Sequence, residues 1–284
     1  MVAKGDNDFD TIFKLRGHQF LETMRCQFMS MAPRSYIDIQ VVSLMCHVLN
    51  AKENERFEKL IYCVPPEILQ RMFETHHHNW MDKKKKKPYE ISTLKNHQEY
   101  LDYLDKEKLV SHRFLFAPVL YSEHWWMYVL DVSQREIFVL DSKNIVSPND
   151  ERTSLNKFSS NILDQMLKWA GAPSMFKKGS HSLLPRYINI PGQPNEFDCT
   201  VFVLKWMELI DPTILAGCCN DNTEYNIEQW TEGNARGIQE EDGDQDNLDQ
   251  GKFIESKSNK GSTRYASDEA WCCSLKSIHS DINS

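Results

Sequence analysis

The sequence predicts a globular domain that combines helices with a β-sheet, and three observations carry this prediction. Apolar residues recur at helical spacing between positions 37 and 49. Runs rich in β-branched and aromatic residues, bounded by turn residues, occupy 114–120, 124–132 and 136–142, which is typical of strands. The last two runs are expected to form a hairpin. A stretch that is apolar nearly all round fills 201–210, so we expect a buried helix there.

Further helices and one more strand are expected around this centre. The spacing of Phe20, Met24 and Met31 favours a helix near the start of the chain. The helix at 37–49 is expected to begin at Ser35 or Tyr36 and to be capped by Asn50. The remaining expected elements are helices at 67–76 and at 160–170, the second ended by Gly171, and a last strand at 187–190.

The composition excludes several classes of protein. The 284 residues are 40% hydrophobic, which suits a sizeable core and is too apolar for a collagen-like or wholly disordered chain. No apolar run approaches the ~20 residues of a membrane-spanning helix, and the first residues lack the apolar stretch of a secretion signal. The net charge of −8 argues against nucleic-acid binding by bulk attraction. We expect a nuclear or cytoplasmic monomer that binds neither membranes nor nucleic acid.

The negative charge is concentrated late in the chain. Residues 231–250 hold seven acidic side chains and one basic side chain, which accounts for most of the net charge. Such a stretch cannot bury enough apolar surface to offset the entropy lost on ordering. We predict a partly helical N-terminal extension at 1–29, a folded domain at 30–230, and a disordered, acidic and glycine-rich tail at 231–284.

A run of lysines leaves its function open, whereas the adjacent histidines and the cysteines argue against metal binding and disulfides. The five lysines at 83–87 form either an exposed loop or a signal for nuclear import or for an acidic partner. The preceding histidines at 76–78 would point in different directions on a helix, and no cysteine or carboxylate stands at metal-ligand spacing, so we expect no metal site. The eight cysteines include no CxxC pair, and without a secretion signal we expect reduced thiols.

Cys199 stands where a thiol can become a nucleophile. It comes just before the expected buried helix, and the first turn of a helix offers free N–H groups and the positive end of the helix dipole. Both favour the thiolate, which is the reactive form. The alternative is that Cys199 is a small buried apolar residue, as free cysteines often are.

His124 and Asp141 flank the expected hairpin. His124 starts one strand and Asp141 ends the next, 17 residues later. If the strands pair about the turn at 133–135, the carboxylate returns to the level of the imidazole and can accept its N–H. Gln193, six residues before Cys199, could donate to an oxyanion together with the backbone N–H of the cysteine. Asp141 could instead be a turn residue, and Gln193 a simple loop residue.

These motifs resemble the Ulp1/SENP family of ubiquitin-like-specific cysteine proteases (peptidase family C48), and in particular its divergent plant-type members. The resemblance runs from about residue 30 to about residue 230, and the segment from Tyr36 to Ser43 resembles the family's early helix. The matching motifs are His124-Trp125, Leu140-Asp141-Ser142, Gln193-Pro194-Asn195 and Asp198-Cys199. Four residue types in this order and spacing are far more specific than any one of them.

The resemblance implies a papain-like α+β fold with a central mixed sheet flanked by helices. It implies that Cys199 is the nucleophile and His124 the general base and acid. Asp141 would orient the histidine, and Gln193 would donate to the oxyanion. The implied activity is cleavage after the C-terminal diglycine of a ubiquitin-like modifier, SUMO above all, and this chemistry needs no metal or organic cofactor.

The resemblance also implies a substrate channel, and the sequence departs from the family near it. Trp125 and Tyr36 would line a passage so narrow that only residues without side chains fit, which explains selectivity for diglycine. Thr200 stands where the family usually has glycine, Tyr36 where it often has tryptophan, and acidic sequence where it usually ends in a helix. The alternative function is therefore a catalytically weak or inactive, transposon-derived domain that binds a modifier.

Overall fold

The computed structural model describes residues 9, 11–14, 22–32, 34–81, 101–143, 148–177, 183–190 and 192–215. The predicted tail at 231–284, the lysine run at 83–87 and the last part of the predicted 30–230 domain lie outside these residues, as do the side chains of His77 and His78. Within the described residues, no helix has both the length and the apolar character needed to cross a membrane.

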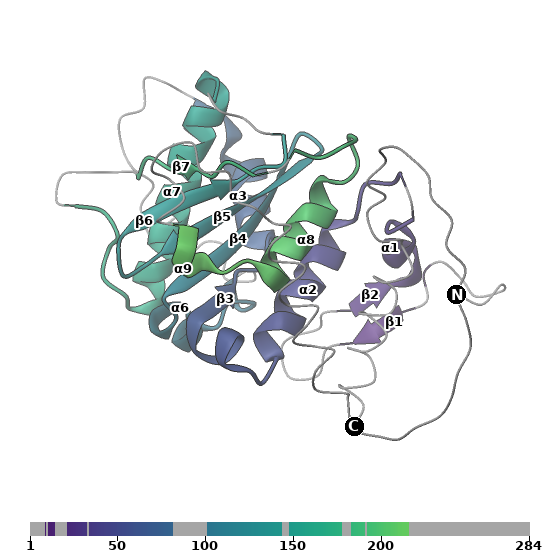
Figure 1. Cartoon of the computed structure of the whole chain (residues 1–284), viewed down its shortest axis with the longest axis horizontal. Coiled ribbons are helices and arrows are strands. Elements are labelled where there is room, and N and C mark those ends of the chain that lie inside the picture. Colours follow the sequence, from purple (N-terminus) through teal and green to yellow (C-terminus); the bar gives the residue numbers. More distant parts are fainter. Residues whose placement is uncertain are drawn as a thin grey trace, which may run out of the picture. The chain divides into compact units, whose positions relative to one another are not determined.

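A five-stranded mixed sheet forms the centre of the fold, in the order β3-β4-β5-β6-β7 (Figure 1). The strands are β3 (Ile61–Cys63), β4 (Phe114–Tyr121), β5 (His124–Asp131), β6 (Glu136–Leu140) and β7 (Arg186–Tyr187). The three central strands are antiparallel, whereas β3 runs parallel to β4 and β7 parallel to β6. This mixed sheet, with its flanking helices, confirms the predicted α+β class.

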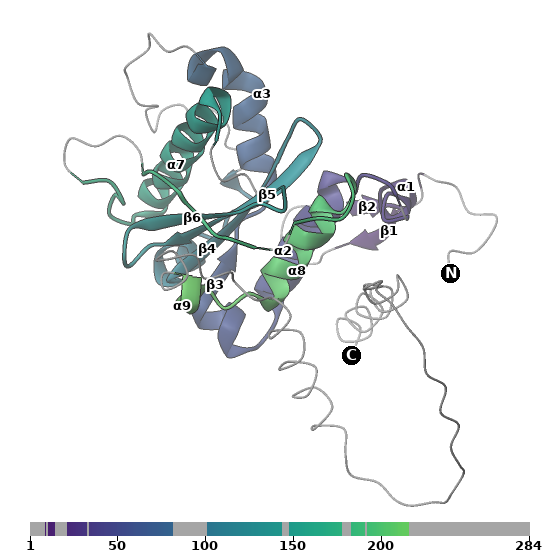
Figure 2. The same ribbon diagram turned by 45° about the horizontal axis from the view of Figure 1, so that its top comes forward.

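Helices cover both faces of the sheet (Figure 2). One face carries α3 (Glu67–Met81) and α7 (Asp150–Ala170), and the other carries α2 (Ile39–Ala51) and α8 (Cys199–Leu209). Because both faces are covered, every residue of β5 is buried. The shorter elements are the single π-helical turn η1 (Arg56–Leu60), α6 (Lys106–Ser111) and α9 (Pro212–Leu215).

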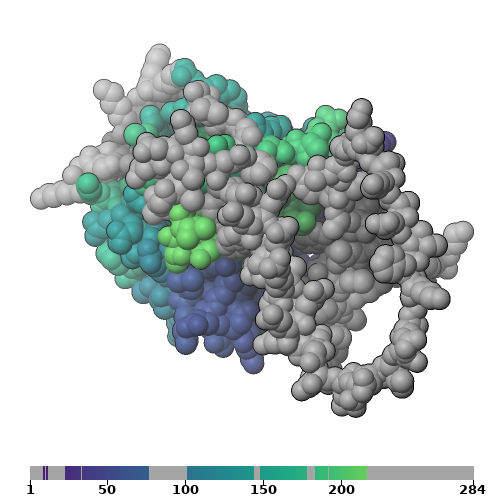
Figure 3. Space-filling model, viewed as in Figure 1, coloured from purple at the N-terminus to yellow at the C-terminus, as the bar shows by residue number. Residues whose placement is uncertain are grey.

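The far end of α8 is tied to η1. The Arg56 guanidinium donates to the carbonyl oxygens of Met207, at 3.2 Å, and Ile210, at 2.7 Å. Carbonyl oxygens at the end of a helix have no N–H donors within the helix, so the arginine satisfies these two. The light-green surface of α9, which follows directly, lies beside the blue surface that contains η1 (Figure 3). The anchored C-terminal end of α8 fixes the direction in which its first residue, Cys199, is presented.

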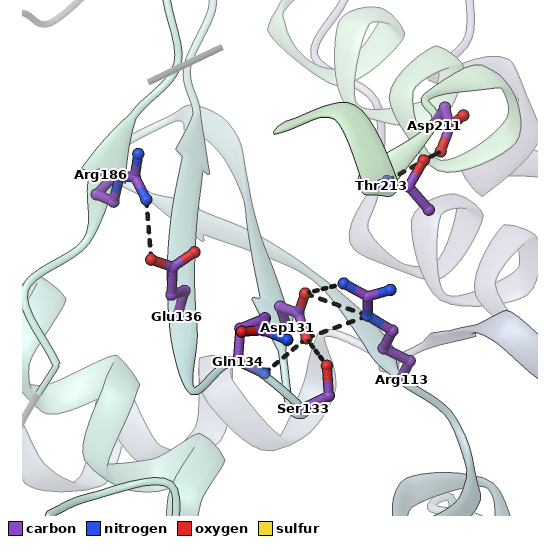
Figure 4. A network of polar contacts seen from close by, with 8 residues as sticks. All are labelled: Arg113, Asp131, Ser133, Gln134, Glu136, Arg186, Asp211 and Thr213. Atoms are coloured by element: carbon purple, nitrogen blue, oxygen red, sulfur yellow. Dashed lines mark hydrogen bonds and ion pairs between the residues drawn. The ribbon is translucent and has the colours of Figure 1, made fainter. Parts of the chain in front are cut away.

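A polar network holds the turn between β5 and β6 (Figure 4). Asp131, 1% exposed, accepts from the Arg113 guanidinium at 2.8 Å, from the Ser133 hydroxyl at 2.7 Å and from the Gln134 backbone at 3.0 Å. These bonds close the turn that the sequence predicted at 133–135. They also set the register of β5 against β6, in which Met127 pairs with Leu140.

The N-terminal segment differs from the helix expected between Phe20 and Met31. Two short antiparallel strands, β1 (Thr11–Lys14) and β2 (Glu22–Met24), form a small separate sheet, and only α1 (Arg25–Met29) is helical. The Gln27 side chain accepts from the Met24 backbone at 2.8 Å, which fixes the start of this short helix. Met24, one of the residues that suggested the helix, therefore lies in a strand, and the helix begins only after it.

The start and end of α2 differ from the prediction. The helix is capped by Asp38, whose carboxylate accepts from the Gln40 backbone at 2.8 Å, so it does not begin at Ser35 or Tyr36. Asn50 lies inside the helix and does not cap it. Its amide instead exchanges two hydrogen bonds with the backbone of Cys63, at 2.7 and 2.8 Å, and thereby ties α2 to β3.

The helix α7 is longer than the predicted 160–170, and β7 is shorter than the predicted 187–190. Asn149 caps α7 by accepting from the Arg152 backbone at 2.8 Å. The helix therefore begins at Asp150, ten residues before the expected start. Its first half carries buried polar residues, which weakened the apolar pattern there. The predicted end is right, because Gly171 adopts φ 102°, a left-handed conformation that suits glycine.

The turn between β4 and β5 places His124 at the first position of its strand. Tyr121 pairs directly with His124, so the loop is only Ser122 and Glu123. These residues have φ values of 47° and 60°, which is the geometry of a two-residue type I′ hairpin. Neither is glycine, asparagine or aspartate, and left-handed backbone costs other residues about 1–2 kcal/mol each. The hairpin therefore holds local strain immediately beside the histidine.

We predict that Glu123→Gly raises the free energy of unfolding by about 0.5–1 kcal/mol, because relief of the left-handed strain exceeds the entropy that glycine adds to the unfolded chain. Urea denaturation checks this. Arg135→Gly is the matched control, since Arg135 has φ 57° in the turn between β5 and β6. A loss of stability at Glu123 alongside a gain at Arg135 would contradict the prediction.

Candidate active site

Cys199 is the first residue of α8 and is fully buried. The preceding residue, Asp198, makes no side-chain cap for the helix, so the first backbone N–H groups of α8 remain available to stabilise a negative charge. Burial alone would raise the pKa of the Cys199 thiol. Interactions with His124 and with the Trp125 backbone outweigh burial, and the pKa is lowered. This cysteine is therefore set to form a thiolate.

His124 and Asp141 meet as the hairpin geometry predicted. The Nε2 atom of His124 lies 2.7 Å from Oδ1 of Asp141, and both residues are buried. Burial disfavours the imidazolium, but the bond to Asp141 and the interaction with Cys199 outweigh it and raise the pKa of His124. Asp141 shows the reverse balance, because bonding to His124 lowers its pKa against the effect of burial. Both shifts favour a charged imidazolium–carboxylate pair.

The second ring nitrogen of His124 is the one that can exchange a proton with Cys199. Since Nε2 is used by Asp141, Nδ1 remains, and it has no hydrogen-bond partner at ordinary distance among the described residues. The pKa values of His124 and Cys199 nevertheless both reflect an interaction between the two side chains. Nδ1 is therefore the ring nitrogen left to exchange a proton with the sulfur, and catalytic hydrogen bonds often tighten only when a substrate binds.

Arg152 contacts Asp141 from the other side, and the sequence analysis missed it. Its guanidinium donates to Oδ2 of Asp141 at 2.8 Å, while the Lys143 backbone N–H donates to Oδ1 at 3.0 Å. Arg152 comes from the first turn of α7, which the sequence pattern did not predict to be helical. No local motif marks it, because its role depends on the packing of α7 against the sheet.

Gln193 is held by the residue that follows Asp141. The Ser142 hydroxyl donates to Oε1 of Gln193 at 2.5 Å, and the Gln193 backbone N–H donates to the Ser142 carbonyl at 2.8 Å. One amide N–H of Gln193 is used by the carbonyl of Asn195 at 2.6 Å. A side-chain amide carries two N–H groups, so the second can still donate elsewhere. Asp141 and Ser142 thus position the histidine and the glutamine respectively.

The residues between Gln193 and Cys199 form a turn built around Asn195. The Asn195 side chain accepts from the backbones of Phe197, at 2.8 Å, and Asp198, at 3.1 Å, and donates to the Asp198 carboxylate at 2.6 Å. These bonds give Asn195 and Asp198 a structural part in the segment before the cysteine. Their part is to shape the chain that delivers Cys199 to the start of α8.

Of the two predicted channel residues, Tyr36 is at the surface and Trp125 is inside. Tyr36 is 42% exposed, and its ring lies against Phe197 with the centroids 5.0 Å apart. Partial burial and the nearby charges of Glu196, Glu123 and Cys199 raise its pKa, so this ring lies near the cysteine. Trp125 is only 1% exposed and contacts the thiol through its backbone.

Thr200, the residue that departs from the usual glycine, is fully buried. Its hydroxyl has no hydrogen-bond partner among the described residues, but its interaction with Cys199 helps to lower the pKa of the thiol. The branched side chain therefore lies within reach of the thiol and contributes to its acidity.

Comparison with known proteins gave one family. A family model described as the Ulp1 protease family, C-terminal catalytic domain, matches residues 42–213, more than half of the 284-residue chain. This match confirms the family predicted from the motifs and spans His124, Asp141, Gln193 and Cys199. A comparison with curated proteins gave no match.

Similar solved structures are distant in sequence. The C-terminal Ulp1 protease domain in complex with Smt3, the yeast ortholog of SUMO, is 13% identical, with 75% of this chain and 80% of that chain covered and a TM-score of 0.46. SUMO protease Ulp1 with its catalytic cysteine oxidised to a sulfinic acid is 16% identical, with 72% and 77% covered and a TM-score of 0.41. For the Ulp1-like SUMO protease catalytic domain of Chaetomium thermophilum, these values are 14%, 65%, 66% and 0.41.

We predict that Cys199 is alkylated by iodoacetamide at lower pH than an ordinary thiol, because its pKa is lowered. In His124→Gln the imidazolium is lost, so the midpoint of the rate against pH should rise by about one to two units. Mass spectrometry of the Cys199 peptide follows the rate. His112→Gln is the matched control, because His112 is also buried but bonds to the Phe57 carbonyl. An unchanged midpoint in His124→Gln would contradict the prediction.

Proposed function

We propose that this chain, which belongs to the Ulp1 protease family, is a cysteine protease that cleaves after the C-terminal diglycine of a ubiquitin-like modifier, with SUMO as the expected modifier. The observation that carries the proposal is the 2.7 Å contact between His124 and Asp141, combined with the lowered pKa of Cys199 at the start of α8. Family membership also supports peptidase chemistry.

In the proposed first step, the Cys199 thiolate attacks the carbonyl carbon of the terminal glycine. The developing oxyanion accepts from the backbone N–H of Cys199 and from the second amide N–H of Gln193. The protonated Nδ1 of His124 then donates its proton to the leaving amine, and a thioester remains on the cysteine. Asp141 stabilises the imidazolium and holds the ring so that Nδ1 faces the sulfur.

The second proposed step releases the modifier. Neutral His124 accepts a proton from water through Nδ1, and the hydroxide attacks the thioester carbonyl. The acyl–sulfur bond breaks, the modifier leaves as a carboxylic acid, and the cysteine returns as thiolate beside the imidazolium. The same oxyanion donors serve both steps, because both pass through a tetrahedral intermediate.

Substrate selection is proposed to depend on the aromatic residues near the cysteine. Tyr36 and Phe197 would form the outer rim, and the buried Trp125 would support the inner wall. The cysteine itself is fully buried, so a substrate tail must be thin to reach it. Glycine residues have no side chain to exclude, which favours a diglycine end. We keep the nuclear or cytoplasmic location as part of this proposal.

A second candidate function is a modifier-binding domain with little or no activity. Two observations favour it: Cys199 has no exposed surface, and the branched Thr200 stands beside it. In this case the aromatic rim would still hold a modifier tail, but the scissile carbonyl would not reach the sulfur.

We predict that the full chain releases fluorophore from a SUMO C-terminal fluorogenic substrate, and that Cys199→Ser lowers kcat by at least about 10³-fold, because the serine hydroxyl is not ionised at neutral pH. Cys63→Ser is the matched control, since Cys63 is an equally buried thiol in β3. Turnover that persists in Cys199→Ser would exclude the proposed mechanism. SUMO, ubiquitin and NEDD8 C-terminal electrophile probes would then rank the modifiers, and binding of SUMO without labelling of Cys199 would favour the second candidate.

We also predict that Gln193→Ala lowers kcat by about 10²-fold and that Ser142→Ala lowers it by about threefold to tenfold, through loss of the bond that orients the amide. In the double variant, Ser142→Ala should add nothing to Gln193→Ala, because Ser142 acts through the glutamine. Ser133→Ala is the control, since its hydroxyl bonds to Asp131 at the far end of β5. Independent, additive losses would contradict the coupling.

A further inference from the structure

Arg152 is an unusual residue for its position in the fold. It lies in the first turn of α7, where the helix dipole disfavours a positive charge, and the residue as a whole is only 8% exposed. Arginine is seldom buried unless it is paired. Its pair is Oδ2 of Asp141 at 2.8 Å, while Oδ1 of the same carboxylate bonds to His124.

The guanidinium is fixed by stacking as well as by the ion pair. Its central carbon lies 3.5 Å above the ring of Trp126, which is 1% exposed in β5. A guanidinium over an aromatic face is held in one orientation, and lysine cannot reproduce that planar contact. The Nε atom of Arg152 has no hydrogen-bond partner among the described residues, so the carboxylate is the main polar group that the guanidinium serves.

The charges of the site balance only when Arg152 is included. The reactive state has a negative Cys199, a positive His124 and a negative Asp141, which leaves one net negative charge in a buried region. An uncompensated buried charge is costly, and a paired one much less so. Arg152 supplies the fourth charge and brings the sum to zero.

We propose that Arg152 is a positioning residue of the reaction, which locks the second oxygen of Asp141 and supplies the positive charge that favours the ionised forms of Asp141 and Cys199 in their buried setting. The inference rests on the proposed protease function. It adds a fourth member to the chain Cys199, His124, Asp141, and this member approaches from α7, on the opposite face of the sheet from α8.

Other titratable groups around the site act in the same region. Lys143, just after β6, lowers the pKa of His124. Tyr128, from the same strand as His124, has its pKa raised by burial, which Arg152 partly opposes. Tyr36, before α2, interacts with Cys199, and Tyr128, in β5, interacts with Arg152. Glu123, in the turn before β5, interacts with Tyr36. Besides His124, Arg152 is the one cation among the described residues that bonds directly to the Asp141 carboxylate through its side chain.

The sign of the effect separates a charge role from a purely structural one. Removing a positive charge makes proton loss harder for both neighbours, so the pH midpoints of Cys199 and of His124 should both move up. Simple misplacement of Asp141 would remove negative charge from the imidazole instead, and the His124 midpoint should then move down. The acid and alkaline limbs of the pH profile therefore report which role applies.

Two variants separate charge from shape. Arg152→Gln can keep a hydrogen bond to Asp141 but not the charge, whereas Arg152→Lys keeps the charge without the planar fork. We expect the midpoint of Cys199 alkylation to rise by about one pH unit in Arg152→Gln, with an alkylation rate about tenfold lower on the acid side, and to stay near wild type in Arg152→Lys. Both variants should lower kcat for the modifier substrate, Arg152→Gln more strongly, with KM little changed.

Arg113→Gln is the matched control. Arg113 also pairs with a buried aspartate, Asp131, at 2.8 Å, but at the other end of β5, about 23 Å along the strand (Figure 4). It should lower the thermal midpoint of unfolding without moving the alkylation midpoint. Melting of every variant shows which ones are folded at the assay temperature, and if Arg152→Gln is not, Arg152→Met is measured in its place at lower temperature.

Three outcomes would overturn the inference: an unchanged alkylation midpoint in Arg152→Gln, an equal rise in Arg152→Lys, or a comparable rise in Arg113→Gln. Alkylation needs no modifier, so this test stands apart from the test of the protease proposal. If no modifier is cleaved but the Arg152→Gln midpoint rises as expected, the charge role holds and the assigned reaction fails. If the modifier is cleaved but the alkylation midpoint of Arg152→Gln does not shift, the assigned reaction holds and the charge role of Arg152 fails.

Discussion

The site depends on the register with which β5 pairs with β6. Met127 lies opposite Leu140, and this pairing brings the end of β6 back beside the start of β5, so that Asp141 reaches His124. Side chains alternate between the two faces of a strand, so a slip of one residue would turn the carboxylate to the wrong face. The buried Asp131 network at the turn fixes this register, and the two-residue hairpin before His124 fixes the pairing of β5 with β4.

Within that frame, consecutive residues divide the work between two partners. Asp141 bonds to the histidine, and Ser142, the next residue, bonds to Gln193 on the chain that leads into α8. Asn195 then shapes the turn that ends at Cys199. The loop before the nucleophile is therefore bonded to the strand that carries the orienting carboxylate. A shift of this strand would therefore shift the loop as well. The relative positions of the sulfur, the imidazole and the amide depend on both segments.

The sequence predicted the parts that depend on local patterns. The hairpin, the buried helix and the Gly171 helix end follow from short-range periodicity and turn residues, and all are present. The meeting of His124 with Asp141 followed from strand geometry, and the family followed from motif order. The first half of α7 was missed because its buried polar residues break the apolar pattern. The N-terminal strands β1 and β2 were missed as well, because Met24 fits the spacing of a helix as well as that of a strand.

Arg152 could not be predicted for a more general reason. It contacts residues from two other elements, Trp126 in β5 and Asp141 after β6. No pattern in the sequence around Arg152 indicates either contact. A buried carboxylate can orient an imidazole only if its own negative charge is stabilised. Water cannot stabilise that charge where both faces of the sheet are covered. The same packing that makes the core stable therefore demands an internal cation. An arginine that is fixed on an aromatic ring meets this demand without solvent, at a helix position that would otherwise disfavour it.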